Sequence, residues 1–374
     1  MSPPERSRKT VLSVFGTRPE AIKMAPVLKL LAKEPGIRSL VCVTAQHREM
    51  LDQVLSLFEI RPDHDLDLMR EGQTLTEITA RALTELAPYL DREKPDLLLV
   101  QGDTTTTMAA SLAAFYARVP VAHVEAGLRT GDKAYPYPEE VNRRVTTVIA
   151  AHHFAPTERA RRNLLGEGIA DAEITVTGNT VIDALLDVVK VKPDRLPTLP
   201  LRGKRIVLVT AHRRENFGAP LQEVIAALKD IASKFADVDV VYPVHRNPNV
   251  NGPVREALGN VPGIHLIDPI EYKAFADLMA ASHIILTDSG GIQEEAPSLG
   301  KPVLVLRDET ERPEAVEAGV VALVGPHREK IVAAASELLE NPKRYAAMAT
   351  RINPYGDGKA AVRILSKVRK LVGS

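Results

Sequence analysis

Residues 11–28 read VLSVFGTRPEAIKMAPVL, a short apolar run followed by a tight turn and a segment with apolar residues at helical spacing. A near-continuous apolar run is typical of a strand that is covered on both faces of a parallel sheet. Gly16 permits the turn, and Pro19 is favoured in the first turn of a helix. The stretch therefore predicts a βα unit, in which free N–H groups at the start of the helix favour an anion.

The same alternation of short apolar runs and helical segments continues through both halves of the 374 residues. It predicts an α/β protein with two doubly wound parallel sheets. The Pro-rich residues 191–200 suit a linker. An apolar stripe over 359–372 predicts a final helix, which packs on its own domain or crosses back to the first. The predicted strands are residues 11–15, 40–44, 96–100 and 120–124 in the first half, and 205–210, 238–244, 283–287, 302–306 and 320–324 in the second.

The composition excludes several classes of protein. The 48 Lys and Arg residues balance 48 Asp and Glu residues, so no global positive field attracts nucleic acid or an anionic membrane. Cys42 is the single cysteine, which excludes a disulfide framework and Cys-rich metal sites. The sequence has neither a membrane-spanning apolar run nor a signal-peptide core. We therefore expect a cytoplasmic protein that binds neither nucleic acid nor membrane.

Two turns in the first half carry candidates for anion binding and proton transfer. Arg18 and Lys23 lie at the start of the first predicted helix, where their charge adds to the free N–H groups. The turn is neither GxGxxG nor a Walker loop, so neither an NAD site nor a P-loop is predicted. Asp103 lies in QGDTTTT at the carboxyl end of a strand, where open α/β sheets bind ligands. A helix cap is the structural alternative for Asp103.

Residues 123–144 form the densest polar segment of the chain. A strand ends at Glu125, a Gly-rich loop follows, and Glu139 lies in the first turn of the next predicted helix. If Asp103, Glu125 and Glu139 converge, repulsion and desolvation raise the pKa of at least one carboxyl group and create an acid/base set. Capping of a surface helix is the alternative for Glu139.

Two strands of the second half end on basic side chains. His212 and Arg213 follow the first of these strands, and His245 follows the next. His beside Arg suits a diphosphate or an acid catalyst. No second ligand lies at the spacing of a zinc site, so no metal is predicted.

The strongest local signal is TDSGGIQEE, a strand that leads through a Ser-Gly-Gly turn into a helix. Successive N–H groups of Ser289, Gly290 and Gly291 form an uncharged diphosphate cradle. Glu295 lies one turn into that helix, where a carboxylate accepts both hydroxyls of a ribose. Arg312 adds a cation beside another predicted helix start.

Together these stretches resemble the non-hydrolysing bacterial UDP-N-acetylglucosamine 2-epimerases, from about residue 10 to the end of the chain. The DSGG turn with its downstream Glu is shared with B-type glycosyltransferases in general, whereas FGTRPEA, HVEAGLRTGD and AHRRE together point to the epimerases. The matching stretches are FGTRPEAIKMAPV (15–27), TAQHREMLDQV (44–54), QGDTTTT (101–107), HVEAGLRTGD (123–132), PYPEEVNR (136–143), TGNTVIDAL (177–185), TAHRREN (210–216), YPVHRNPNV (242–250), TDSGGIQEEAPSLGKPVLVLRD (287–308), TERPEA (310–315) and NPYGDG (353–358).

The resemblance implies a fold of two Rossmann-like domains that face each other across a cleft, as in B-type glycosyltransferases. It implies an N-terminal domain of residues 1–177, joined by the C-terminal helix 359–374, and a UDP-binding domain of residues 178–358. The crossover then lies near TGNT rather than in residues 191–200. We also expect a homodimer.

The expected substrate is UDP-N-acetylglucosamine, and the resemblance implies that the second domain holds most of its nucleotide, with Phe275 near the uracil. Ile270 stands where some relatives carry Gln, so a backbone contact to the uracil would survive here and a side-chain contact would not. The implied substrate-binding residues are Arg18, Lys23, Arg213, Phe275, Ser289, Gly290, Gly291, Glu295 and Arg312.

The implied reaction inverts C2 reversibly, by anti elimination of UDP to 2-acetamidoglucal and re-addition of UDP with protonation of the opposite face. It needs positioned carboxylates and a stabilised leaving diphosphate. It needs no cofactor, because no carbinol is oxidised. The implied catalytic residues are Asp103, Glu125, Glu139 and His212, the last acting with Arg213 at the leaving phosphate. Which carboxylate removes the proton and which returns it stays open.

Relatives also bind a second UDP-N-acetylglucosamine as an activator, and the matching residues here are Gln46, Arg213 and His245. Gly72 stands where some relatives have Arg, which puts this regulation in doubt. Three alternatives stay open. They are a hydrolysing epimerase that releases N-acetylmannosamine and UDP, a B-type glycosyltransferase that needs an acceptor, and a UDP-sugar sensor without catalysis.

Overall fold

The computed structural model describes residues 8–44, 48–68, 70, 72–191, 199–201, 205–350 and 352–373. The chain divides into two compact units, the first formed by Met1–Ala184 with Gly358–Ser374 and the second by Leu185–Asp357. Residues 192–198, most of the Pro-rich segment, lie outside the described residues. No helix in the described part of the chain has the length and apolarity needed to cross a membrane.

The first unit is built on a seven-stranded parallel sheet with the strand order β3-β2-β1-β4-β5-β6-β7. Its strands are β1 (Lys9–Phe15), β2 (Ile37–Val43), β3 (His64–Asp65), β4 (Leu97–Gln101), β5 (Val121–Val124), β6 (His152–Ala155) and β7 (Ile174–Val176). Its helices are α1 (Arg18–Leu31), α2 (Arg48–Leu57), α3 (Leu75–Glu93), α4 (Thr105–Tyr116), α5 (Glu139–Ile149), α6 (Glu158–Gly166), the 3₁₀ turn η1 (Asp171–Glu173), the first residues of α7 (Thr180–Lys190), and α15 (Ala360–Val372).

The second unit has a six-stranded parallel sheet with the strand order β10-β9-β8-β11-β12-β13. Its strands are β8 (Arg205–Thr210), β9 (Val238–Pro243), β10 (Ile264–Ile267), β11 (Ile284–Thr287), β12 (Val303–Val305) and β13 (Val321–Leu323). Its helical segments, besides the end of α7, are η2 (Arg214–Asn216), α8 (Ala219–Lys234), α9 (Pro248–Leu258), α10 (Tyr272–Ala281), α11 (Gly290–Glu295), η3 (Ala296–Leu299), α12 (Pro313–Glu317), α13 (Arg328–Glu340) and α14 (Pro342–Met348).

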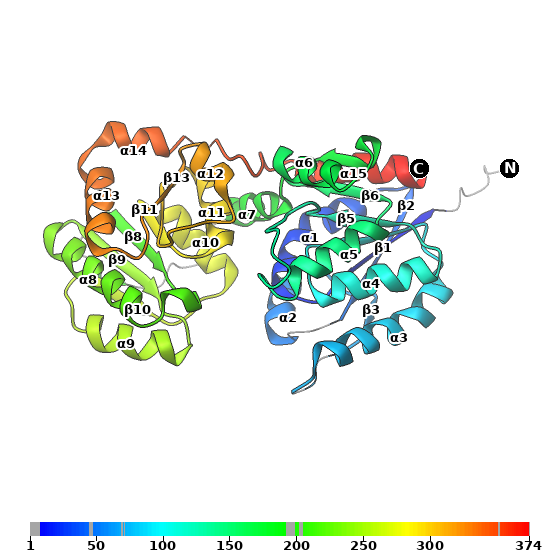
Figure 1. Cartoon of the computed structure of the whole chain (residues 1–374), viewed down its shortest axis with the longest axis horizontal. Coiled ribbons are helices and arrows are strands. Elements are labelled where there is room, and N and C mark those ends of the chain that lie inside the picture. The colour runs from blue at the N-terminus through cyan, green and yellow to red at the C-terminus, as the bar shows by residue number, and fades with distance from the viewer. Residues whose placement is uncertain are drawn as a thin grey trace. The chain divides into compact units, whose positions relative to one another are not determined.

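Both sheets reverse their winding direction once, which confirms the predicted α/β fold with two doubly wound sheets. The reversal lies between β1 and β4 in the first sheet and between β8 and β11 in the second. Right-handed crossovers that leave a strand in opposite directions place their helices on opposite faces of the sheet, and helices flank each sheet in Figure 1. Side chains just past these strands lie where such folds bind ligands.

The helix starts follow from local sequence. Thr17 caps α1 and Glu20 completes a capping box, so the turn predicted after residue 15 ends in a well-defined helix start. The last helix, α15, belongs to the first unit and packs beside α1. The carboxylate of Asp183 accepts hydrogen bonds from the N–H groups of Ala360 and Ala361, at 3.2 and 2.9 Å, which satisfies two donors at the start of α15.

Candidate functional site

The loops after β1 and β4 meet at the switch point of the first sheet and share one buried carboxylate, Glu20. Its Oε2 accepts hydrogen bonds from the N–H groups of Gly16 and Thr17, at 2.9 and 2.7 Å. Its Oε1 lies within hydrogen-bond distance of the hydroxyls of Thr104 and Thr107, at 2.5 and 3.0 Å. Burial raises the pKa of Glu20 above its ordinary value, although these hydrogen bonds oppose the rise. Glu20 therefore ties the two loops together.

Position 16 needs a glycine because the neighbouring loops leave no room for a side chain. A Cβ atom added to Gly16 would lie 1.9 Å from Oγ1 of Thr44 and 2.8 Å from Oγ1 of Thr106. Those two hydroxyls are themselves hydrogen-bonded at 2.9 Å. Glycine thus lets the first turn approach its neighbours, as the sequence predicts for a tight turn.

Glu125 lies directly after β5 and is held by three side chains. Lys23 contacts both carboxylate oxygens, at 2.6 and 2.7 Å, and Asn179 donates to Oε1 at 2.9 Å. The amide of Gln101 donates to Oε2. The backbone of Glu125 has a φ of 67°, a left-handed conformation that costs a non-glycine residue about 1–3 kcal/mol. Lys23 and Glu125, both predicted site residues, are therefore brought into direct contact.

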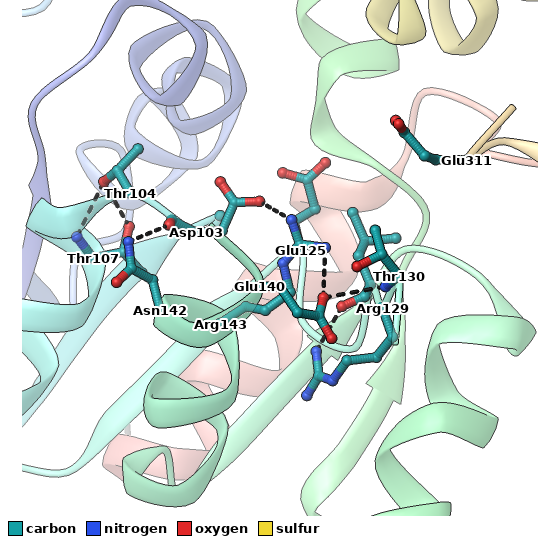
Figure 2. Close-up of polar contacts among 12 residues, drawn as sticks. Asp103, Thr104, Thr107, Glu125, Arg129, Thr130, Glu140, Asn142, Arg143 and Glu311 are labelled. Atoms are coloured by element: carbon teal, nitrogen blue, oxygen red, sulfur yellow. Dashed lines mark hydrogen bonds and ion pairs between the residues drawn. The ribbon is translucent and has the colours of Figure 1, made fainter. Parts of the chain in front are cut away.

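Asp103 follows β4 and is held by α5. Its carboxylate pairs with the guanidinium of Arg143 at 2.5 Å, and its carbonyl accepts a hydrogen bond from the Asn142 amide at 3.0 Å. The same guanidinium lies 3.5 Å from the buried carboxylate of Glu140. Figure 2 shows Arg143 between Asp103 and Glu140. The carboxylate of Asp103 remains about one-third exposed, so a ligand has access to it.

Glu139 and Arg18 have no comparable partners. Glu139 lies in the first turn of α5, and its buried Oε2 has no hydrogen-bond partner among the described residues. Arg18 begins α1 and is half-buried, and the described residues offer its guanidinium no ion pair. An unpaired carboxylate oxygen and an unpaired cation are groups to which a polar ligand can bind.

Sequence reasoning missed the residues that hold these candidates. Gln101, Arg143 and Asn179 all lie within motif stretches quoted above, which was the available signal. Another such residue is His123 in β5, the strand that precedes Glu125. Its Nε2 is hydrogen-bonded to the carbonyl of Gly102 at 2.6 Å. Burial lowers the pKa of His123 to about 3, so its ring is neutral and supports the turn before Asp103.

The switch point of the second sheet is organised by Asp288, which is fully buried and was not among the predicted residues. Its Oδ2 accepts hydrogen bonds from the N–H groups of His212 and Arg213, at 2.7 and 2.8 Å. The amide of Asn216 donates to the same oxygen at 3.1 Å. Asp288 therefore fixes the backbone of two predicted site residues.

His212 and His245, predicted from successive strands, are in contact. Their rings stack with centroids 5.3 Å apart and planes inclined by 15°. Burial lowers the pKa of His212, and the nearby charge of Asp288 opposes that decrease. His245 is exposed, and its Nδ1 accepts a hydrogen bond from the N–H of Asn247 at 3.1 Å.

The Ser-Gly-Gly turn leads into α11, with Ser289 at the N-cap position. The N–H of Ser289 is used within the turn, because it donates to Oγ1 of Thr287 at 3.0 Å. The described residues provide no acceptor for the N–H groups of Gly290 and Gly291. A Cβ atom added to Gly290 would lie 3.8 Å from the guanidinium of Arg213, so this cation runs beside the turn. Two glycine donors and one arginine thus form a positively polarised surface.

The remaining candidates of the second unit surround this turn. Glu295 ends α11, and its Oε2 accepts a hydrogen bond from the hydroxyl of Tyr272 at 3.1 Å. Tyr272 is the first residue of α10, and Phe275 lies half-buried one turn further along that helix. Arg312 donates through Nε to the buried carboxylate of Glu294. Arg312 is therefore tied to α11 by an ion pair that the sequence did not reveal.

Two other predictions concern ligands and regulation. No group of three or more His, Cys, Asp or Glu side chains in the described ranges is placed to hold a metal ion. Gln46, predicted at an activator site, lies outside the described residues. Gly72 is described and adopts a positive φ of 71°, a conformation that glycine favours.

In both units the candidate side chains follow the central strands of a doubly wound parallel sheet, which defines a protein with two Rossmann-like units. Residues 29–369 match the model of the UDP-N-acetylglucosamine 2-epimerase family. The chain is 58% identical over 368 residues to UDP-N-acetylglucosamine 2-epimerase of Escherichia coli K12, covering 96% of this chain and 98% of the relative. The chain therefore belongs to the UDP-N-acetylglucosamine 2-epimerase family.

Solved structures agree with this assignment. The enzyme from Neisseria meningitidis, bound to UDP-GlcNAc, is 53% identical with a TM-score of 0.88, covering 96% of this chain and all of the other. The enzyme from Methanocaldococcus jannaschii, in complex with UDP-GlcNAc and UDP, is 34% identical with a TM-score of 0.79. In that comparison, 96% of this chain and 99% of the other are covered.

Proposed function

We propose that the protein interconverts UDP-N-acetylglucosamine and UDP-N-acetylmannosamine without releasing free sugar. Membership of the family supports the substrate. The observation that carries the chemistry is the placement of three acidic side chains in one unit. Asp103 and Glu125 follow the neighbouring strands β4 and β5, and Glu139 lies in the first turn of α5. Each carboxylate has a different environment, which is how proteins separate acid from base.

The second unit supplies the proposed groups for UDP. The diphosphate would accept hydrogen bonds from the N–H groups of Gly290 and Gly291, beside the guanidinium of Arg213, whereas Ser289 would shape the turn because its own N–H donates to Thr287. Glu295 would accept the ribose hydroxyls, and Phe275 would lie near the uracil. Arg312, fixed by Glu294, would add positive charge. Every one of these contacts is a role that mutagenesis can test.

The proposed reaction has two steps that balance. In the first, a carboxylate removes the C2 proton while the bond from C1 to the UDP oxygen breaks, which gives 2-acetamidoglucal and UDP. In the second, UDP adds to C1 and a protonated group delivers a proton to the opposite face of C2. Cations and N–H donors stabilise the charge that develops on the leaving diphosphate. His212 would assist at that phosphate together with Arg213.

The test is incubation of UDP-N-acetylglucosamine with the purified protein in deuterated water. We expect deuterium at C2 of both recovered UDP-sugars and no free sugar, because the proton is exchanged between elimination and re-addition. Accumulation of free N-acetylmannosamine with UDP would instead establish the hydrolysing reaction. Absence of C2 exchange would exclude both epimerase mechanisms.

We also propose that a second molecule of UDP-N-acetylglucosamine acts as an activator through Gln46, Arg213 and His245. The exposed ring of His245, stacked on His212, is the described group that supports it. Initial rates that rise sigmoidally with substrate concentration, and become hyperbolic in His245→Ala, are expected. Hyperbolic rates in the unmodified protein would contradict the activator.

A further inference from the structure

Asp288 lies just before the start of α11, but its hydrogen bonds go to another loop, the one that follows β8. It follows β11, is fully buried, and uses Oδ2 for the N–H groups of His212 and Arg213 and for the amide of Asn216. Its other oxygen, Oδ1, is also buried and has no hydrogen-bond partner among the described residues. An unsatisfied carboxylate oxygen in the interior costs free energy unless some state of the protein satisfies it.

The group that faces Oδ1 is the imidazole of His212. Its Nδ1 lies 3.3 Å from Oδ1, close enough for an ion pair and slightly misaligned for a hydrogen bond. The other charged or titratable groups near this ring are His245, which stacks on it, and Arg213. The described residues provide no partner for Nε2 of His212.

We propose that Asp288 is the positioning residue for His212, a role that rests on the function proposed above for this histidine. Oδ2 holds the backbone of the loop, and Oδ1 receives the Nδ1–H of the ring. This hydrogen bond fixes the tautomer in which Nε2 carries the lone pair and lies on the side of the ring away from the carboxylate. A carboxylate behind a histidine orients the ring in the same way in other proton-transfer sites.

The charge of Asp288 has a second effect on the same ring. Burial, His245 and Arg213 all lower the pKa of His212, and Asp288 is the group that opposes them. Removal of the negative charge therefore leaves the neutral ring still more favoured. In a variant without this charge, the limb of the pH–rate profile that reports the titration of His212 should therefore move toward lower pH, whichever protonation state of His212 the reaction uses.

The second unit contains a matched control for this pair. Asp239 in β9 is also fully buried, and its Oδ1 lies 2.8 Å from Nε2 of His265 in β10. Both residues stand near the amino ends of their strands, at the edge of the sheet opposite to the candidate site. Asp239→Asn removes a buried Asp–His pair of the same unit without touching a proposed site residue.

The experiment compares Asp288→Asn with Asp239→Asn in the full chain. The asparagine keeps an acceptor for the two N–H groups and loses the charge beside His212. We expect kcat to fall about 10- to 100-fold in Asp288→Asn with KM changed less than about threefold, and the His212 limb of the kcat profile to move to lower pH. Asp239→Asn should keep kcat and the pH profile of the unmodified protein. An unchanged kcat and profile in Asp288→Asn would overturn the proposal.

His212→Asn separates this inference from the proposed function. If His212→Asn retains full turnover, the catalytic role of His212 fails, and the positioning role fails with it. If His212→Asn is impaired, the double variant His212→Asn/Asp288→Asn should be no slower than His212→Asn alone, because Asp288 acts through the ring. If the losses of kcat in the two single variants added up in the double variant, Asp288 would not act through the ring of His212. In the unmodified protein, ¹⁵N NMR should show His212 protonated at Nδ1, and a neutral ring protonated at Nε2 would overturn the proposal even if the variants did not fold.

Discussion

The switch points of the two sheets share one structural feature, a buried carboxylate that binds backbone N–H groups, but the residues around it differ. In each unit a buried carboxylate accepts hydrogen bonds from two successive N–H groups of the loop that follows the first central strand. Glu20 binds Gly16 and Thr17 after β1, and Asp288 binds His212 and Arg213 after β8. A doubly wound sheet brings two loops together at its switch point, and a buried carboxylate is one way to join them.

The difference lies in what surrounds this carboxylate. In the first unit, the carboxylates that follow two neighbouring strands are paired with cations from helices. Glu125 pairs with Lys23 of α1, and Asp103 pairs with Arg143 of α5. In the second unit the loop after β11 presents glycine N–H groups. The first environment suits proton transfer and the second suits an anion. One topology thus supports two kinds of chemistry, because the site depends on the loops rather than on the sheet.

The largest effect is expected from Asp103→Asn. Loss of a general acid or base costs about 10² to 10⁴ in rate, so kcat for epimerisation should fall by that factor. Turnover is measured by the conversion of UDP-N-acetylglucosamine in deuterated water.

Asp96→Asn is the control for Asp103, because the two carboxylates flank the same strand. Asp96 precedes β4 and accepts hydrogen bonds from Lys9 and from the N–H of Thr10, at 2.9 and 2.8 Å. Its loss should lower the unfolding midpoint and leave kcat within about threefold of normal. Turnover of Asp103→Asn within threefold of the unmodified protein would remove Asp103 from the proposed acid/base set.

The second largest effect is expected on stability from Glu20→Ala. The buried N–H of Gly16 would lose its acceptor at a cost of about 1–3 kcal/mol, and the partly buried N–H of Thr17 would lose the same acceptor at a smaller cost. Glu20→Gln keeps an acceptor and the shape of the side chain, and it should cost about 1 kcal/mol or less. Urea denaturation measures both. Equal midpoints for the two variants would show that the carboxylate does not hold the loop.

A smaller loss of stability is expected from Gly16→Ala. The added methyl group would overlap the hydroxyls of Thr44 and Thr106, and overpacking of this kind costs about 1–3 kcal/mol. Gly166→Ala, at the end of α6, meets no atom within 4 Å and is the matched control. We expect its midpoint to be unchanged or slightly raised. A Gly16→Ala variant as stable as Gly166→Ala would mean that the loops separate readily.

The last prediction concerns pH, and its effect is small at any one pH near neutrality. The pKa of His123 is lowered to about 3 by burial, whereas an unfolded histidine has an ordinary pKa near 6.5. Between these values the unfolded chain binds a proton that the folded chain does not, so stability falls as the pH falls from about 6.5 toward 3. His123 contributes up to about 1.4 kcal/mol for each pH unit in this window. His123→Gln should therefore show a shallower acid loss of stability in urea titrations, and an equal slope would contradict the buried neutral ring.

Among the described residues, the sequence predicted all of the central strands and the short outer strands β12 and β13, but it missed four other strands, β3, β6, β7 and β10. Near-continuous apolar runs marked β1, β4, β8 and β9, because strands covered on both faces must be apolar throughout. The two residues of β3 give no periodicity to detect. The strand β6 reads HHFA, and its two histidines concealed a buried strand.

The candidate site was predicted as a set of residues, and its internal pairing was not. Motif spacing placed Asp103 and Glu125 after strands, where the structure has them. Nothing in the spacing indicated that Arg143 pairs with Asp103 or that Asn179 holds Glu125, because these partners lie 40 and 54 positions away in the chain. Pairing across such separations is decided by tertiary packing.

By itself, the sequence determined that this protein has two doubly wound sheets with turns at the ends of their central strands. Those features depend on local periodicity and turn chemistry, which are written in neighbouring residues. The tertiary structure alone decided which polar groups are buried and with whom they pair. Asp288 shows the reason, because a carboxylate that reads as part of a surface turn becomes fully buried once a loop 75 positions earlier supplies its donors.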